Sequence, residues 1–157
     1  MHPAGHFATA AALSSGVFVA TRSPAMTAGA FGGGFLIDLD HVFDYVTFNR
    51  QRNFHPSSFL RYYLRDRDFR WVVLPLHAYE LMCALAVIAY FFPHPLLLGY
   101  LIGAALHMGL DVIFNQNVCK SSVLFYSILY RAARGFSRDR LIRTTAPATP
   151  GYDTPLP

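Results

Sequence analysis

The sequence predicts an all-α integral membrane protein, a helical bundle of about four spans with an interfacial helix towards the C-terminus. Its 157 residues are 54% hydrophobic and only 14% charged, whereas soluble domains contain about 25% charged residues. The mean hydropathy is +0.31. The apolar residues form long runs that arginine-rich segments separate. A chain of this length has room for a single core.

The first two spans are expected at residues 5–20 and 28–48. The first consists mainly of small residues, which let helices approach closely in lipid. The second begins with the glycine-rich stretch GAFGGGF at 29–35. We interpret that stretch as unwound or re-entrant, a backbone that membranes tolerate only where protein covers it or where it lines a cavity.

The third and fourth spans are expected at residues 71–92 and 96–114, each long enough at roughly 20 residues to cross a bilayer, with a tight turn at 92–95 between them. A basic, aromatic-rich loop precedes the third span, and an interfacial helix is expected after Pro56.

The C-terminal part contains one more apolar stretch, at 122–131, which is too short to cross and is expected at the interface. We therefore divide the chain into a membrane-embedded domain, residues 1–143, and a tail, residues 144–157. The tail is rich in proline and threonine, a composition that predicts disorder.

The basic residues indicate the topology. They fall in two groups beside the spans: Arg50, Arg52, Arg61, Arg65, Arg67 and Arg70 in one, and Lys120, Arg131, Arg134, Arg138, Arg140 and Arg143 in the other. The positive-inside rule makes both groups cytoplasmic. The expected location is therefore the inner (cytoplasmic) membrane, multi-pass, with the N-terminus in the cytoplasm.

The partners expected from this charge distribution are membrane lipids. Four arginines of the first loop would contact anionic headgroups and, for a lipid substrate, hold its phosphate: Arg61, Arg65, Arg67 and Arg70. The net charge of +4 arises from arginines that flank apolar spans, so no nucleic acid is expected. The composition is compatible with a homo-oligomer.

Ionisable residues cluster at three places within the apolar spans. Burying such groups is costly, and they persist where they face a cavity, a partner or an ion. The clusters are Asp38, Asp40, His41 and Asp44; His77 and Glu80; and His107 and Asp111. On helices, spacings of three and four residues place side chains on one face. Histidine nitrogen with carboxylate oxygen suits zinc, manganese or iron.

The expected topology puts His6 and all three clusters at similar depth in the cytoplasmic half of the membrane, which predicts one shared site. The candidate metal ligands are His6, Asp38, Asp40, His41, His77, Glu80, His107 and Asp111. They would hold one or two divalent cations, most simply zinc, with manganese or iron as alternatives. Glu80, the sole glutamate of the chain, is interpreted as a ligand or the general base, and Asp40 as a second catalytic group.

Each of these residues also has a structural interpretation. A histidine such as His107 on an apolar helix is often a hydrogen-bonded packing residue. Asp111 could bond a neighbouring helix, and Glu80 could pair with an arginine of the basic loop. Asp44 could meet that loop at the interface. The two histidines next to prolines, His55 and His94, are expected at the surface.

Three motifs carry a resemblance to a known family: GHF at 5–7, D-x-D-H at 38–41 after the glycine-rich stretch, and H-x-x-x-D at 107–111. Over about residues 5–115 the chain resembles the membrane-bound metal-dependent hydrolases of bacteria and archaea. The resemblance implies metal binding by the residues of these motifs, together with His77.

The chain departs from the pattern of that family at two places. Ile37 stands where many relatives have proline, and residues 77–80 replace a motif with a second histidine. Glu80 would then substitute for the missing ligand.

The function expected is hydrolysis of a phosphoester or lipid substrate by a metal-activated water. A small ion or proton transporter is the alternative from another class, since acid–histidine chains also form relays in membranes. A third possibility is a non-catalytic protein whose metal only ties the helices together. The outer halves of the spans, around residues 16–20 and 85–92, are apolar. Their composition favours the hydrolase.

Overall fold

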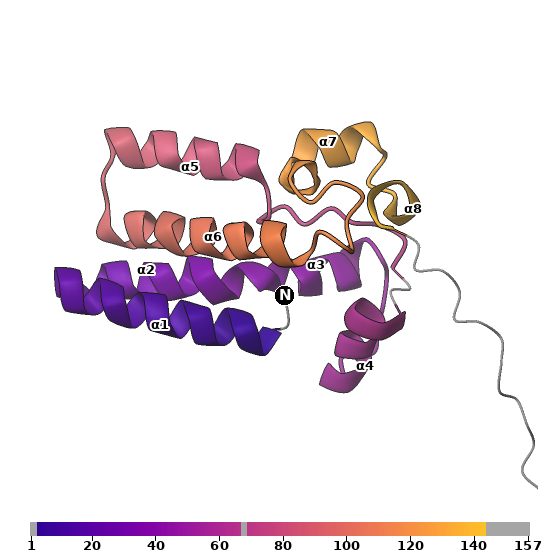
Figure 1. Ribbon diagram of the computed structural model, residues 1–157, viewed down its shortest axis with the longest axis horizontal. Coiled ribbons are helices and arrows are strands. Elements are labelled where there is room, and N and C mark those ends of the chain that lie inside the picture. Colours follow the sequence, from indigo (N-terminus) through magenta and orange to yellow (C-terminus); the bar gives the residue numbers. More distant parts are fainter. Residues whose placement is uncertain (1–2, 67–68, 144–157) are drawn as a thin grey trace, which may run out of the picture.

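The computed structural model describes residues 3–66 and 69–143, without the side chains of residues 64–66. This part of the chain is all-helical and contains no β-strand, as predicted. Four longer helices lie side by side (Figure 1). They are α1 (Pro3–Thr21), α2 (Pro24–Phe35), α5 (Tyr79–Phe91) and α6 (Pro95–Phe114). Helix α2 packs between α1 and α6, and α5 lies on the other side of α6.

Two of the described helices, α1 and α6, are long and apolar enough to cross a membrane by length and composition. Helix α5 is apolar but shorter, with 13 residues. The expected turn at residues 92–95 is present, because α5 ends at Phe91 and α6 begins at Pro95.

Helices α2 and α6 touch through their backbones. A Cβ atom on Gly33 would lie 2.0 Å from the Tyr100 carbonyl oxygen, and one on Gly103 would lie 2.1 Å from the Ala30 carbonyl oxygen. Gly29 and Gly99 make equally close approaches. The expectation of an unwound glycine-rich stretch is therefore wrong. Glycines four residues apart form a flat helix face, which a second such face covers while both helices stay regular.

The second predicted span is divided rather than continuous. Helix α2 ends at Phe35, a 3₁₀ turn (Leu36–Asp38) follows, and α3 (Leu39–Thr47) begins after it. Asp40 and Asp44 point inward and are buried, whereas Leu39 and Phe43 are exposed. Helix α3 thus buries polar residues and exposes apolar ones, the reverse of a helix on a soluble protein.

The third predicted span is helical only from Tyr79 onward. Residues 71–78 form a loop that passes through the core. Pro75 explains this, because proline lacks a backbone donor and disfavours helix at the residue before it. That residue, Leu74, has a positive φ of 44°. His77 therefore precedes the helix, and the expectation that it shares a helix face with Glu80 is wrong.

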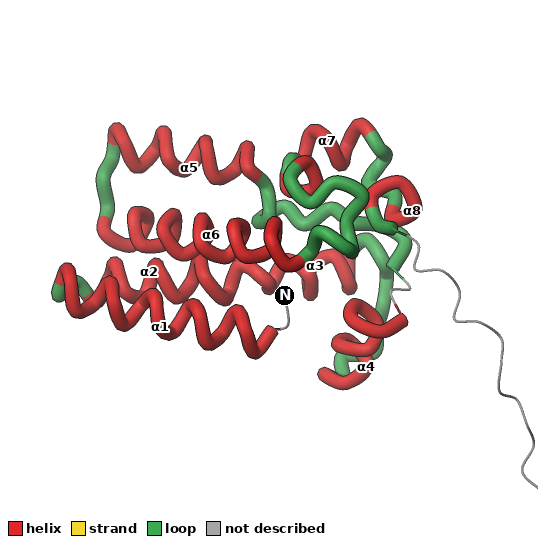
Figure 2. Tube along the Cα trace, viewed as in Figure 1, coloured by secondary structure: helices red, strands yellow, loops and turns green. Residues whose placement is uncertain are grey.

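The remaining short elements gather at one end of the long helices, where most of the loops also lie (Figure 2). They are α4 (Pro56–Leu60), continued by a wider helical turn at Arg61–Asp66, then a 3₁₀ turn (Leu124–Tyr126), α7 (Ile128–Ala133) and α8 (Arg138–Leu141). Helix α4 begins at Pro56 itself, earlier than the expected start after Pro56-Ser57-Ser58, and α7 begins within the 122–131 stretch. The position of both segments at the membrane interface stays a prediction. The tail at 144–157 lies outside the described residues.

Candidate metal centre

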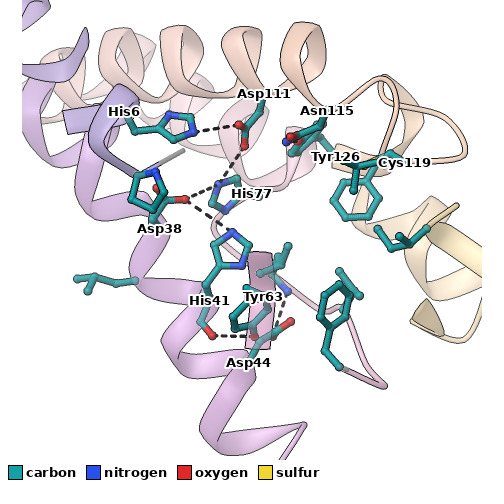
Figure 3. A pocket seen from close by; sticks show the side chains of 18 of the residues that line it. His6, Asp38, His41, Asp44, Tyr63, His77, Asp111, Asn115, Cys119 and Tyr126 are labelled. Carbon is teal, nitrogen blue, oxygen red and sulfur yellow. Dashed lines mark hydrogen bonds and ion pairs between the residues drawn. The ribbon is translucent and has the colours of Figure 1, made fainter. Parts of the chain in front are cut away.

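Six of the eight candidate ligands converge at the loop-rich end of the bundle (Figure 3). His6 comes from α1, Asp38 from the 3₁₀ turn after α2, and His41 from α3; His77 comes from the loop before α5, and His107 and Asp111 from α6. Residues far apart in the sequence thus form one cluster, with four members buried and two, Asp38 and His41, partly exposed. His107 and Asp111 share a helix face, as their spacing predicted.

The cluster consists of two adjoining groups of three: His6, His107 and Asp111, and Asp38, His41 and His77. Within each group the nearest ligand atoms all lie within 4.8 Å of one another. The groups meet where Nε2 of His77 lies 3.0 Å from Nε2 of His107. Asp38 Oδ1 lies 3.5 Å from the first of these nitrogens and 3.4 Å from the second.

The hydrogen bonds of His77 and His107 determine which ring nitrogens face inward as acceptors. His107 Nδ1 lies 2.9 Å from the Gly34 carbonyl oxygen, which can only accept, so Nδ1 carries the proton. His77 Nδ1 lies 3.0 Å from the Asp40 carboxylate and likewise donates. Two Nε2 lone pairs therefore face each other when both rings are neutral. Such an arrangement needs a shared cation, either a proton or a metal ion.

His6 and His41 flank this centre. His6 Nε2 lies 3.0 Å from Asp111 Oδ1, and its ring stacks on that of His107 with centroids 3.9 Å apart. His41 Nε2 lies 3.7 Å from Asp38 Oδ1. The Nδ1 atoms of both rings are buried without a hydrogen-bond partner in the described part of the chain. Buried polar atoms are normally satisfied, so these orphans fit a site that another species completes.

Asp40 supports the cluster rather than joining either group of three. Its Oδ2 accepts hydrogen bonds from the backbone amides of Leu76 and His77 at 3.0 and 3.2 Å, and its carboxylate also holds His77 Nδ1. A carboxylate behind a ligating histidine fixes the ring orientation and raises its basicity. The structure therefore gives Asp40 a positioning role, in place of the ligand and catalytic roles expected.

Asp44 fixes the same loop one helical turn further along α3. It accepts from the amides of Val73 at 2.7 Å and Leu74 at 3.2 Å. Its side chain is buried and does not meet the basic loop at the interface as expected. Asp40 and Asp44 together clamp the loop that carries His77.

Glu80 lies outside the cluster. Its carboxylate accepts from the Ser127 hydroxyl at 2.5 Å and from the amides of Ile128 and Leu129 at 2.9 and 3.3 Å. It thus binds the first turn of α7, where backbone donors lack partners within the helix. Because the helix begins only after Ala78, Glu80 faces α7 and not the histidines. The geometry supports neither its ligand role nor its general-base role.

Arg131 is a functional candidate that sequence reasoning assigned only to the basic flank. It is fully buried, and its Nη2 donates to the carbonyl oxygens of Leu74 at 3.1 Å and His77 at 3.0 Å. Burial lowers the pKa of Arg131, and the negative charges of Asp40 and Asp44 oppose that shift. An arginine inside the apolar stretch 122–131 is the sequence feature that could have indicated this buried position.

Two tyrosines complete the surroundings, and neither was singled out from the sequence. The Tyr63 hydroxyl donates to the His41 carbonyl oxygen at 2.9 Å. Tyr126 is buried, and its hydroxyl accepts from Asn115 Nδ2 at 2.9 Å. Burial, together with the negative charge of Asp111, raises the pKa of Tyr126 well above its usual range. Its hydroxyl therefore stays protonated.

The arginines expected to contact lipid are only partly described. Arg61 and Arg70 are exposed, while the Arg65 side chain and Arg67 lie outside the described residues. Their contact with headgroups stays a prediction. His55 and His94 are exposed, as predicted.

Comparisons with models of protein families, with curated proteins and with solved structures found no match.

Proposed function

We propose that this chain is an integral membrane metal-dependent hydrolase, the activity implied by the family that it resembles, and that it acts on a phosphoester or lipid substrate. The observation that carries the proposal is the buried cluster of His6, Asp38, His41, His77, His107 and Asp111, which lies beside a cavity. Buried His and Asp groups of this kind could hold a metal ion.

The donor atoms suit a divalent cation. Around an ion with bonds of about 2.1 Å, tetrahedral ligands lie roughly 3.4 Å apart. The inward atoms of His77, His107, Asp38 and Asp111 have five recorded separations between 3.0 and 3.9 Å. When bound, a zinc, manganese or iron ion supplies Lewis-acid polarisation and lowers the pKa of a bound water to about 7. His6 and His41 would complete the coordination or hold a second ion.

The residues of the cluster differ in exposure, and we assign them different roles on that basis. The side chains of Asp38 and His41 are 27% and 31% exposed, whereas those of His6, His77, His107 and Asp111 are at most 7% exposed. Asp38 and His41 therefore meet substrate and water at the cavity. The buried members hold the cation together with the inward oxygen of Asp38, and Asp40 and Arg131 fix the position of His77.

The distribution of apolar residues supports a place in the membrane. Large apolar side chains are exposed on the long helices, for example Phe7, Phe18, Val87 and Ile102, while the buried positions include a whole set of charged and imidazole groups. Exposed apolar surface of this extent needs a partner or lipid. Multi-pass insertion in the cytoplasmic membrane, with the N-terminus inside, accounts for this surface and for the arginine distribution.

The far half of the bundle favours hydrolysis over transport. A relay needs polar groups that continue across the membrane. Among the described residues of α1, α2 and α6, the buried polar side chain beyond the cluster is Ser14, whose hydroxyl donates to the Ala10 carbonyl of its own helix. The helices otherwise meet through glycine and alanine there.

The test is metal content and hydrolysis by purified protein in detergent, with a soluble phosphoester and a soluble carboxylic ester as substrates. His107→Ala should lose most bound metal and hydrolysis together, and the exposed control His55→Ala should keep both. Full metal retention by folded His107→Ala would contradict the site. Metal bound by the native protein without hydrolysis of either substrate, or of a long-chain ester in the detergent micelles, would contradict the hydrolase and leave a metal-stabilised scaffold or a transporter.

A further inference from the structure

We infer that the substrate is an amphiphile with one long hydrocarbon chain, which enters the cavity sideways from the membrane and presents its headgroup linkage to the His/Asp cluster. The inference rests on the proposed function, because it names the substrate class of that same site. The volume of the cavity, the exposure of its mouth and the placement of its polar groups support it.

The cavity has a volume of about 350 Å³, within the range of about 300–1,000 Å³ typical of small-molecule sites. Its wall away from the cluster is apolar and comes from α3, α4, the 71–78 loop and the C-terminal segment. Representative wall residues are Leu39, Phe59, Phe69, Val72, Phe125 and Ile142. Hydrocarbon is the ligand chemistry that such a wall favours.

Apart from Asp44, the carboxylates and histidines of the lining lie at one end, and the remaining carboxylate and hydroxyl groups have hydrogen-bond partners. His6, Asp38, His41, His77 and Asp111 form the cluster end (Figure 3). Elsewhere in the lining, the carboxylate of Asp44 binds loop amides, the Tyr63 hydroxyl donates to a backbone carbonyl, and the Tyr126 hydroxyl accepts from Asn115.

No lysine or arginine lines the described cavity. A sugar or nucleotide would bury polar groups there without partners, which costs binding free energy. An alkyl chain has no such groups.

The mouth of the cavity faces the apolar surface of the protein. Leu36, Leu39, Leu60 and Trp71 line the cavity and are nevertheless 45%, 58%, 38% and 37% exposed. The neighbouring exposed residues of α3 are also apolar: Val42, Phe43 and Val46. A mouth framed by apolar side chains beside an apolar face opens towards lipid, so a chain can slide in without passing through water.

The size of the cavity admits one chain. At roughly 30 Å³ for a unit the size of a water molecule, the space holds on the order of ten methylene groups.

The test uses the fluorescence of Trp71, the single tryptophan of the chain. Protein in nanodiscs of a saturated phospholipid receives a neutral amphiphile whose dodecyl chain carries bromine, a collisional quencher, at its far end. Quenching should saturate, and an unbrominated dodecyl amphiphile should reverse it. The butyl homologue should quench at least roughly tenfold more weakly, because each buried methylene adds affinity.

Matched variants test the route of entry. Leu60→Arg places a charge at the mouth and should abolish saturable quenching. Phe54→Arg is the control, since Phe54 is 68% exposed in the preceding segment and does not line the cavity. Linear quenching that is equal in the native protein and both variants would show simple partitioning into lipid and overturn the inference.

Failure of the inference is separable from failure of the proposed function. His107→Ala should keep saturable quenching, because the chain contacts the wall and not the ligands. In hydrolysis, esters with one headgroup should show kcat/KM rising with chain length. Metal-dependent hydrolysis with no chain-length preference and no saturable quenching would overturn the inference while leaving the function. Saturable quenching without any hydrolysis would support a chain-binding site and overturn the function.

Discussion

The two ends of the bundle are held together in different ways. Away from the cluster, α2 and α6 meet backbone to backbone through Gly29, Gly33, Gly99 and Gly103. At the cluster end, the 71–78 loop is held by side chains on its amides and carbonyls, from Asp40 and Asp44 on one side and Arg131 on the other. The contact between α2 and α6 requires glycine, which has no side chain. The contacts that hold the 71–78 loop require charged side chains.

This difference separates stability from site geometry. Close helix contact in lipid derives from packing and tolerates no extra volume. The cluster end also contains buried apolar residues such as Val72, Leu74 and Phe125, but its polar contacts fix a histidine that no regular helix presents. Substitutions in the glycine contact between α2 and α6 should therefore lower the stability of the whole fold. Substitutions of the residues that hold the 71–78 loop should weaken metal binding, lower local stability, or both, depending on the residue.

The largest effect is expected at Gly33. Gly33→Ala should destabilise the protein by about 3 kcal/mol or more, because its Cβ would overlap the Tyr100 carbonyl. The adjacent Gly32 has nothing within 4 Å of its Cβ position, so Gly32→Ala should be neutral or stabilising by up to about 1 kcal/mol. Thermal unfolding in detergent, followed by circular dichroism, measures both. Equal melting temperatures for the two variants would refute the steric account.

A smaller and more selective effect is expected from the carboxylates of α3. Asp40→Asn should weaken metal affinity by about 10–100-fold, because the amide no longer orients and polarises His77 as a carboxylate does. Asp44→Asn should lower stability by about 1–3 kcal/mol, since a charged acceptor for two buried amides is lost, while metal affinity changes little. Metal titration of both variants measures the two affinities. An equal loss of affinity would mean that metal binding depends on the conformation of the whole loop and not on the orientation of the His77 ring.

The smallest effect is expected at Glu80. Glu80→Gln should keep metal content and hydrolysis and lower stability by about 1 kcal/mol, the usual cost of losing a helix cap. Ser127→Ala, which removes the hydroxyl that donates to Glu80, should have a similar effect on melting temperature. A large loss of activity with intact metal in Glu80→Gln would restore Glu80 as the general base.

The sequence predicted the elements that depend on local pattern. Length and hydropathy gave α1 and α6 and the turn before Pro95. The arginine distribution and helix lengths placed His6, Asp38, His41, His77, His107 and Asp111 at one depth, and the structure brings these residues together. Depth could be estimated because each candidate lay within a few turns of a span end.

The expectations that proved wrong depended on tertiary contacts or overlooked the effect of Pro75. Gly29 and Gly33 lie in a regular helix and pack against the α6 backbone at Gly99 and Gly103, a contact that spacing within one segment does not reveal. Pro75 was visible and should have moved the expected start of the third helix to a later residue. The partners of Glu80 could not be found from sequence, since the direction of its side chain follows from where α5 begins.

The contact of Arg131 with the His77 carbonyl joins residues 54 positions apart, and this has a consequence for biogenesis. His6, Asp38, His41, His77, His107 and Asp111 are all synthesised before the residue that secures the central loop. Nascent chains that end before Arg131 contain every candidate ligand, yet the carbonyl oxygens of Leu74 and His77 lack the Arg131 donor. Under the proposed function, we therefore expect the centre to reach its final geometry, and to bind its metal tightly, only after the C-terminal segment has left the ribosome and docked.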